Sequence, residues 1–393
     1  MTSSAAHSLR TPKGRMIEIP IGGRTAEAFL AVHHSGSGPG ILFLPDGGLD
    51  DGMRARAELF GEEGYCVLAP DLGAGATPED VAAAADALRA MSEHDGKTVA
   101  IGHGPGGALA LDAAPAADFD CVVAFDGAGV TEGALVGRRC PVALIFGTKD
   151  DPAAAREAER LRAVLDAKDG SGVYEFADAA PEFSVPGRGG WDKRVDGLAH
   201  SRALEIIRRI AGPYYDYVAL FAEHARHEFE TLDVDATMAT MVDEPYVNHV
   251  PTLSGGVGHD FLKRFYKYHF IGQNSKERDS VAISHTIGPD RVVIESVVRF
   301  RHDTVLDRLY SGIEPSGEFV EIAHVLIVKF RGDRVCHEHI HWDQGSALAQ
   351  IGLLDATNLP IAGPEAAHKL LDETLPSNQF MQDVWATSEG KPV

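Results

Sequence analysis

Five short apolar runs between residues 41 and 150 alternate with amphipathic segments, and this alternation constrains the fold most strongly. The runs are ILFLP, YCVLAPD, TVAIGHG, CVVAFDG and PVALIFGTKD. Near-continuous apolar strands are buried on both faces, and helices between consecutive strands make the strands parallel. The sequence therefore predicts an α/β domain with a doubly wound sheet over residues 16–211.

A different pattern begins after Gly212–Pro213. Helical segments precede four long strand candidates, SVAISHTIG, RVVIESVVRFRHDTV, EFVEIAHVLIVKF and RVCHEHIHWD. Helices followed by long antiparallel strands are typical of an α+β domain. We therefore expect a second domain over residues 214–356 with a pocket under its helices, a C-terminal extension over residues 357–393, and a tail over residues 1–15.

The formal net charge of -22 argues against two classes of partner. An acidic surface repels phosphate backbones and anionic lipid headgroups, so neither nucleic acid nor a membrane is expected. The first residues lack the apolar run of an export signal, and the four cysteines are too few for a disulfide framework. The sequence thus predicts a cytoplasmic protein whose partner is a small-molecule substrate.

The segment GHGPGG at residues 102–107 follows a buried strand and opens a helix. One interpretation is a dinucleotide-binding GxGxxG turn, with Asp126 as the ribose partner. The other is a nucleophile elbow, which lies on a sharp strand-to-helix turn in the middle of a sheet. Two strand–helix units precede the segment, and this position favours the elbow.

With the elbow in this place, residues 16–211 resemble the dienelactone hydrolase branch of the α/β-hydrolases. The resemblance depends on GPGILFLPDGGLDD, EEGYCVLAPDL, GHGPGG and PVALIFGTKDDP. It implies a catalytic triad with its nucleophile position at Gly104, its acid at Asp150 and its histidine at Pro181. Glycine has no side chain to form an acyl-enzyme, so we expect a degenerate, non-catalytic domain. Asp150 is then either a leftover acid or the cap of the next helix.

Residues 214–356, which hold most of the 18 histidines, resemble the SnoaL-like polyketide cyclases, of the nuclear-transport-factor-2-like α+β cone fold. The segments that carry this resemblance include EPYVNHVPTLSGGVGHDFLKRFY, PSGEFVEIAHVLIVKFRGDRV and HEHIHWDQGSALAQIGLLD. The resemblance implies an acid/base residue at Asp343. The same fold hosts isomerases, dehydratases and epoxide hydrolases, so the fold does not fix the reaction.

Alternation along the last strand candidate places His337, His339, His341 and Asp343 on one face. We expect this face to line the pocket, with Asp343 as the acid/base residue and His302, His339 and His341 as its partners. The alternative for Asp343 is that it caps the SALAQIGLL segment.

The expected substrate-binding residues are Tyr246, Asn248, His249 and Trp342. Asn248 and His249 lie in the segment YVNHVP, which reads as a loop, where they would either orient a substrate oxygen or brace the loop.

A second constellation points to hydrolysis. Arg301-x-Asp303, together with Tyr246-x-Asn248 and Asp343, is similar to the limonene epoxide hydrolase set, which positions an attacking water. The alternative is that Arg301 and Asp303 form an ordinary surface pair.

No metal site and no cofactor are predicted. His337 and His341 would lie about 13 Å apart along a strand, whereas metal–nitrogen bonds are only about 2 Å long. His224 and His227 have a helical spacing that suits ligands, but the sequence offers no third one.

These patterns together predict a cofactor-independent cyclase, isomerase or dehydratase that acts on an apolar, carbonyl-bearing, polyketide-like molecule in the C-terminal pocket. The alternatives are an epoxide, ester or lactone hydrolase with water activated by Asp343 and Asp303, and a non-enzymatic binding or scaffold protein. A homodimer paired through the outer face of the C-terminal sheet is also expected.

Overall fold

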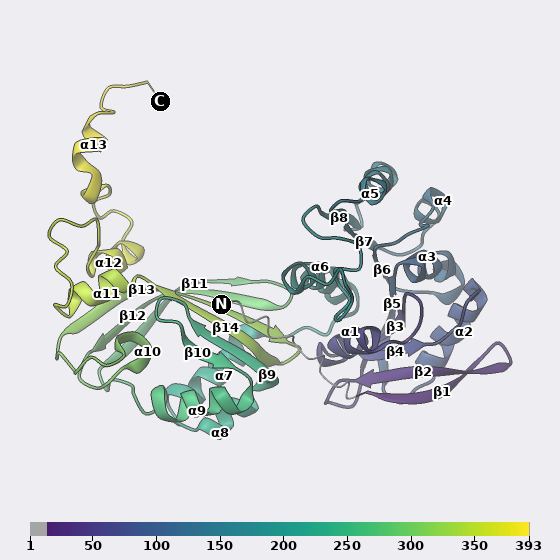
Figure 1. Cartoon of the computed structure of the whole chain (residues 1–393), viewed down its shortest axis with the longest axis horizontal. Helices are drawn as coiled ribbons and strands as arrows, with labels where there is room; N and C mark the ends of the chain where they lie inside the picture. Colours follow the sequence, from purple (N-terminus) through teal and green to yellow (C-terminus); the bar gives the residue numbers. More distant parts are fainter. Residues whose placement is uncertain (1–13, 393) are drawn as a thin grey trace. The chain divides into compact units, whose positions relative to one another are not determined.

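The computed structural model describes residues 14–392 and divides into two compact units between Tyr214 and Tyr215 (Figure 1). Apart from Gly14 and Arg15, the tail expected from the sequence lies outside the described residues. Within this range, no helix combines the length and the apolar character that crossing a bilayer requires.

The N-terminal unit contains an eight-stranded sheet in the order β1-β2-β4-β3-β5-β6-β7-β8. Strand β2 pairs antiparallel with β1 and β4, and the remaining neighbours are parallel. The strands are β1 (Arg15–Ile21), β2 (Arg24–Val32), β3 (Gly38–Leu44), β4 (Cys66–Pro70), β5 (His94–His103), β6 (Val122–Phe125), β7 (Val142–Gly147) and β8 (Gly172–Phe176).

Helices cover both faces of this sheet. They are α1 (Asp51–Glu62), α2 (Pro78–Arg89), α3 (Pro105–Ala117), α4 (Glu132–Val136), α5 (Pro152–Val164) and α6 (Lys193–Ala211). One apolar core includes residues of α2, α3, α4 and α5, and the second core includes residues of α1 and α6. Strands β4, β6 and β7 are buried along their whole length, as expected of strands covered on both faces. The predicted α/β-hydrolase-like fold of this half is confirmed.

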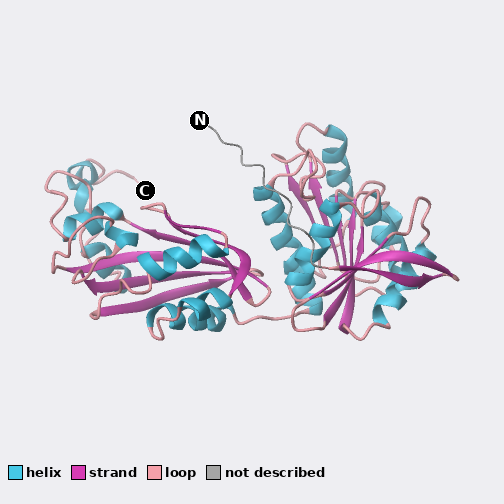
Figure 2. Ribbon diagram, turned by 60° about the horizontal axis from the view of Figure 1, so that its bottom comes forward, coloured by secondary structure: helices cyan, strands magenta, loops and turns pink. Residues whose placement is uncertain are grey.

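The C-terminal unit contains a mixed six-stranded sheet in the order β10-β9-β14-β13-β12-β11. Figure 2 shows the strands of both units in magenta. Only β9 and β14 are parallel neighbours. The strands are β9 (Met241–His249), β10 (Ser254–Val257), β11 (Arg278–Ile287), β12 (Arg291–Arg301), β13 (Phe319–Arg331) and β14 (Arg334–Trp342).

Helices α7 (Tyr217–Phe229), α8 (Val234–Ala239) and α9 (His259–His269) pack on one face of this sheet. The other helices are α10 (Asp307–Tyr310), α11 (Gln344–Gln350), α12 (Glu365–Leu371), α13 (Gln382–Ala386) and the short 3-10 helix η1 (Gln379–Met381). Residues of α10 and α11 form a second small core with β12 and β13. The chain after residue 214 is therefore an α+β unit.

Strand β9 occupies most of the segment YVNHVP, for which the sequence predicts a loop. Residues 241–249 pair with β14 in parallel and with β10 in antiparallel fashion. Pro245 inside the strand and Gly255–Gly256 in its partner obscure the strand pattern, because both residue types are rare inside strands. Because Asn248 and His249 are consecutive residues of this strand, their side chains point to opposite faces of the sheet.

Candidate functional site

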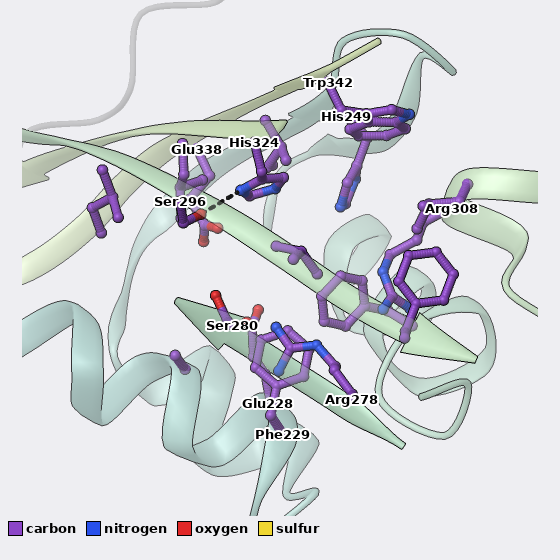
Figure 3. A pocket seen from close by; sticks show the side chains of 18 of the residues that line it. Glu228, Phe229, His249, Arg278, Ser280, Ser296, Arg308, His324, Glu338 and Trp342 are labelled. Carbon is purple, nitrogen blue, oxygen red and sulfur yellow. Dashed lines mark hydrogen bonds between the residues drawn. The ribbon is translucent and has the colours of Figure 1, made fainter. Parts of the chain in front are cut away.

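A cavity of about 420 Å³ lies between helix α7 and the inner face of the C-terminal sheet (Figure 3). Cavities of this size accommodate drug-sized small molecules. Most lining side chains are apolar, and the strands contribute every second residue because side chains alternate between the faces of a sheet. The lining residues are Glu338, Ile340 and Trp342 on β14, Ile322, His324 and Leu326 on β13, and Arg278, Ser280 and Ala282 on β11.

Three buried titratable groups meet at one end of the cavity. The Nε2 atom of His224 lies 3.0 Å from Oε1 of Glu338 and 3.2 Å from Oε1 of Glu228. The other ring nitrogen, Nδ1, lies 2.6 Å from the hydroxyl of Thr240, and the hydroxyl of Tyr266 donates to Oε1 of Glu338 over 3.5 Å. Glu228 and Glu338 line the cavity, whereas His224 lies behind them.

The charges of this cluster depend on one another. Burial lowers the pKa of His224, but the carboxylates of Glu228 and Glu338 outweigh burial and raise this pKa to about 10. Burial raises the pKa of Glu338 above its ordinary value, and His224 opposes part of that increase. His224 thus favours the ionised form of a desolvated carboxylate that faces an apolar cavity, which is the environment of an enzymatic base.

The same cluster has a donor set that could hold a divalent metal ion. One nitrogen of His224 and one oxygen each of Glu228 and Glu338 lie within 4.8 Å of one another, and imidazole nitrogens and carboxylate oxygens are ligand types that such ions accept. The helical spacing in the sequence points instead to His224 and His227 as possible ligands. Nε2 of His227 lies 3.1 Å from Oε1 of Glu223, away from the cavity. The spacing of His224 and Glu228, four residues apart on one helix face, was the pattern that the sequence analysis missed.

Two further imidazoles face the cavity in their neutral form. His249 is buried and its Nδ1 lies 3.2 Å from the carbonyl oxygen of Ser254. Burial, assisted by the charge of Arg308, lowers the pKa of His249 to about 3. His324 contacts the hydroxyl of Ser296 over 3.3 Å, the contact dashed in Figure 3.

The pKa of His324 is lowered to about 4 by burial and, to a smaller extent, by the nearby arginines Arg278 and Arg308. Neutral imidazoles can donate or accept a hydrogen bond without adding charge. Of the substrate-binding residues expected from the sequence, His249 and Trp342 line the cavity.

The prediction that His337, His339 and His341 on β14 face the pocket is wrong. Glu338, Ile340 and Trp342 line the cavity, so the alternate residues His337, His339 and His341 lie on the opposite face. Asp343 is exposed, and its Oδ1 accepts a hydrogen bond of 2.9 Å from the backbone N–H of Gly345 as the N-cap of α11. Alternation divides a strand into two faces, but the helices packed on the sheet decide which face is enclosed.

Tyr246 and Asn248 also lie outside the cavity. The ring of Tyr246 packs edge-on against His339, with 5.2 Å between ring centroids, and Asn248 pairs with His339 in the register of β9 and β14. Neither residue lines the cavity, and both lie on the face opposite His249. Their expected placement against a substrate is therefore corrected.

The other residues expected in the pocket, Arg301, His302 and Asp303, do not converge on the cavity. Arg301 donates to a carboxylate oxygen of Glu277 over 2.8 Å, and Asp303 is exposed. His302 is buried, but its Nδ1 contacts the hydroxyl of Ser316 over 3.1 Å and the side chain does not line the cavity. Arg301 is thus engaged in a surface ion pair, although with Glu277 and not with Asp303.

In the N-terminal unit, Gly104 occupies the sharp turn between β5 and α3. Its φ of 52° and ψ of -127° are the strained backbone conformation of an elbow, which glycine adopts at the lowest cost. A Cβ atom at this position would lie 3.0 Å from the carboxylate of Asp46. Arg188 donates to the backbone oxygen of Asp46 over 2.8 Å and to the carboxylate of Glu182, the neighbour of Pro181, over 2.7 Å. An arginine–carboxylate cluster therefore lies beside the elbow.

Two aspartates of this unit, Asp126 and Asp151, accept hydrogen bonds from backbone N–H groups. Asp150 is exposed, and the helix cap considered for it is made by Asp151, which accepts from the N–H groups of Ala153 and Ala154. Asp126, the ribose partner in the dinucleotide interpretation, accepts instead from the N–H groups of Gly147 and Glu182. These contacts brace two loops at the carboxyl ends of the strands.

Comparison with known proteins gives a family match for part of the N-terminal unit. Residues 75–211 match the Dienelactone hydrolase family. The N-terminal unit is a dienelactone hydrolase-like α/β-hydrolase domain. A comparison of the chain with curated proteins gives no match.

Several solved structures are similar to this hydrolase-like domain. A dienelactone hydrolase-like promiscuous phosphotriesterase from metagenomic libraries is 21% identical and aligns over 51% of this chain and 98% of its own, with a TM-score of 0.41. A dienelactone hydrolase from Anabaena variabilis is 19% identical and aligns over 52% of this chain and 100% of its own, with a TM-score of 0.43. Esterase 2 from Thermogutta terrifontis, phosphorylated by paraoxon, is 16% identical and aligns over 52% of this chain and 98% of its own, with a TM-score of 0.39.

Proposed function

We propose that the C-terminal unit is an acid/base enzyme that moves a proton on an apolar, carbonyl-bearing small molecule, with Glu338 as the base. The observation that carries this proposal is the position of Glu338. Its side chain is only 5% exposed, faces a cavity of about 420 Å³ and touches His224 over 3.0 Å. A desolvated carboxylate that is held ionised by a buried cation is suited to accept a proton from carbon.

In the proposed step, a carboxylate oxygen of Glu338 takes a proton from the carbon next to the substrate carbonyl. The electron pair of the broken C–H bond moves to the carbonyl oxygen, and the enolate that forms accepts a hydrogen bond from the neutral imidazole of His324, whose other ring nitrogen accepts from the hydroxyl of Ser296. Glu338 then returns the proton to another atom of the substrate. His224 keeps its own proton and acts as a positioning residue.

This step is common to isomerisation, dehydration and cyclisation by carbanion attack, so we propose the reaction at the level of proton transfer. The six-stranded sheet, covered on one face by α7, α8 and α9, supports extending the SnoaL-like resemblance to this unit. Pairing of two copies through the outer face of that sheet stays a prediction.

Hydrolysis is the second candidate, and the family match of residues 75–211 favours it. Gly104 at the elbow offers no nucleophile, so any hydrolysis there would use water directly. An ester or lactone that is turned over in ¹⁸O-labelled water would then give product with label in the carboxylate, whereas a proton-transfer reaction leaves the label in the solvent.

Exchange of carbon-bound protons tests the proposal without knowledge of the natural substrate. We expect the full chain to accelerate deuterium exchange at the α-carbons of 2-tetralone in D₂O, followed by NMR. The Glu338→Gln variant should lose roughly 100-fold or more of this acceleration, the usual contribution of a general base. Exchange by a folded Glu338→Gln variant at the wild-type rate would refute the role of Glu338.

A further inference from the structure

Within residues 14–392, Arg278 is the one arginine of the cavity lining that has no hydrogen-bond or ion-pair partner. Arg226 is held by Glu223, whose Oε1 lies 2.6 Å from the Nη2 atom. Arg308 donates to the backbone oxygen of Gln273 and to Oδ1 of Asn274 over 3.0 Å and 2.7 Å. The guanidinium of Arg278 makes no hydrogen bond or ion pair with any described residue.

The Arg278 side chain is nevertheless held in place. Its guanidinium carbon lies 3.8 Å from the centroid of the Phe229 ring, a cation–π contact that fixes the group against helix α7 (Figure 3). The carboxylates of Glu228 and Asp279 act on its charge from a distance. A half-buried guanidinium whose N–H donors are not used by the protein is available to bind an anionic group of a ligand.

The surroundings of Arg278 favour an anion. Ser280 is the next residue on the same face of β11, and Ser296 faces the same cavity from β12. Burial and then the charge of Arg278 lower the pKa of Arg308 to about 10, so the two cations act on one region of the cavity. A carboxylate at Arg278 would relieve this repulsion and would accept two parallel N–H bonds.

The mouth of the cavity lies near Arg278. Among the lining residues, Ala222 on α7 and Ser280 and Ala282 on β11 are exposed, whereas His249 and Glu338 are buried. A ligand held at Arg278 would therefore place its body in the apolar interior and its anionic end near the mouth.

We propose that Arg278 binds the carboxylate of an apolar acid whose ring system fills the cavity lined by Phe221, Phe229, Phe270 and Trp342. This inference rests on the proposed function for the identity of the cavity as the substrate site, and it names the substrate class: carbonyl compounds that also carry a carboxylate. The carboxylate is bound and does not react.

Calorimetric titration of the full chain with 2-naphthoate and with its neutral analogue 2-naphthalenemethanol tests the proposal. We expect the wild type to bind 2-naphthoate about tenfold or more tightly than the alcohol, which corresponds to one good charge-assisted contact. The Arg278→Met variant should lose this preference but bind the alcohol as the wild type does, which shows that the cavity is intact. Arg226→Met is the matched control and should keep the preference.

Three results would overturn the assignment: an unchanged preference in Arg278→Met, equal binding of the two ligands by the wild type, or binding of neither. The Glu338→Gln variant separates this proposal from the proposed function. If that variant and the wild type both prefer 2-naphthoate while neither accelerates proton exchange, the anion site stands and the proposed catalytic function falls.

Discussion

The Nε2 atom of His224 on helix α7 lies 3.0 Å from Oε1 of Glu338 on strand β14. This contact ties the helix that covers the sheet to the strand that carries the proposed base. It also lowers the cost of ionising the buried carboxyl group of Glu338. The acidity of the cavity and the stability of the unit therefore depend on the same pair.

The rate of proton exchange should rise with pH, because only ionised Glu338 accepts a proton. Burial raises the pKa of Glu338, so the midpoint should lie above the ordinary glutamate value of about 4.3. In the His224→Gln variant the midpoint should move to still higher pH, since the cation that favours the carboxylate is gone. A pH–rate profile with a wild-type midpoint at or below the ordinary value would contradict this prediction.

His224→Gln should also lower the free energy of unfolding by about 3–5 kcal/mol at neutral pH, the usual cost of leaving a buried charge unpaired. The pKa of His224 is raised to about 10, against about 6.5 in an unfolded chain. Its contribution to stability is complete below about pH 6.5 and is lost as the pH rises through 10, so the difference between wild type and variant should shrink over that range.

Chemical denaturation of both proteins at several pH values measures this difference. His227→Gln is the matched control, because His227 contacts the exposed Glu223 and such pairs contribute roughly 1 kcal/mol or less. A difference between wild type and His224→Gln that grows with pH would show that His224 is not the buried cation.

Asp343→Ala should leave the rate of exchange unchanged. Asp343 lies outside the cavity and caps α11, so its removal should cost about 0.5–2 kcal/mol of stability and no activity. Thermal unfolding and the exchange assay on the same preparation check both parts. A loss of exchange by more than tenfold in a folded variant would return Asp343 to the mechanism.

Chelation should not affect proton exchange, because the proposed base is a carboxylate paired with a protonated imidazole. The measurement is the exchange rate after dialysis against EDTA, together with the metal content of the purified full chain. Since His224, Glu228 and Glu338 have ligand-compatible positions, a stoichiometric divalent ion whose removal abolishes exchange would replace the proposed mechanism by a metal-dependent one.

A fluorophosphonate probe should leave the hydrolase-like domain unlabelled. Gly104 has no nucleophilic atom, and even Gly104→Ser should stay unlabelled, because the resemblance to dienelactone hydrolases implies Pro181 at the position of the histidine that would activate the serine. Mass spectrometry of tryptic peptides locates any adduct. An adduct within residues 16–211 of the wild type would show that this domain has a nucleophile that the elbow does not reveal.

The sequence by itself determined the architecture of the first half. Runs such as VALIFG in β7 are apolar without interruption because both faces of the strand are covered by helices. Local pattern and burial agree there, so the alternation of strands and helices and the place of Gly104 at the elbow follow from residues that lie close together in the chain.

Only the tertiary structure decided which groups meet in the C-terminal cavity. The alternation of β14 separates His339 from Glu338 equally well in either orientation, and packing of α7 onto the sheet decides that Glu338 is enclosed. Glu228 and Arg278 reach the cavity from other elements, through contacts between residues far apart in the chain. A sequence pattern records the two faces of a strand, whereas burial of one face depends on the elements that fold against it.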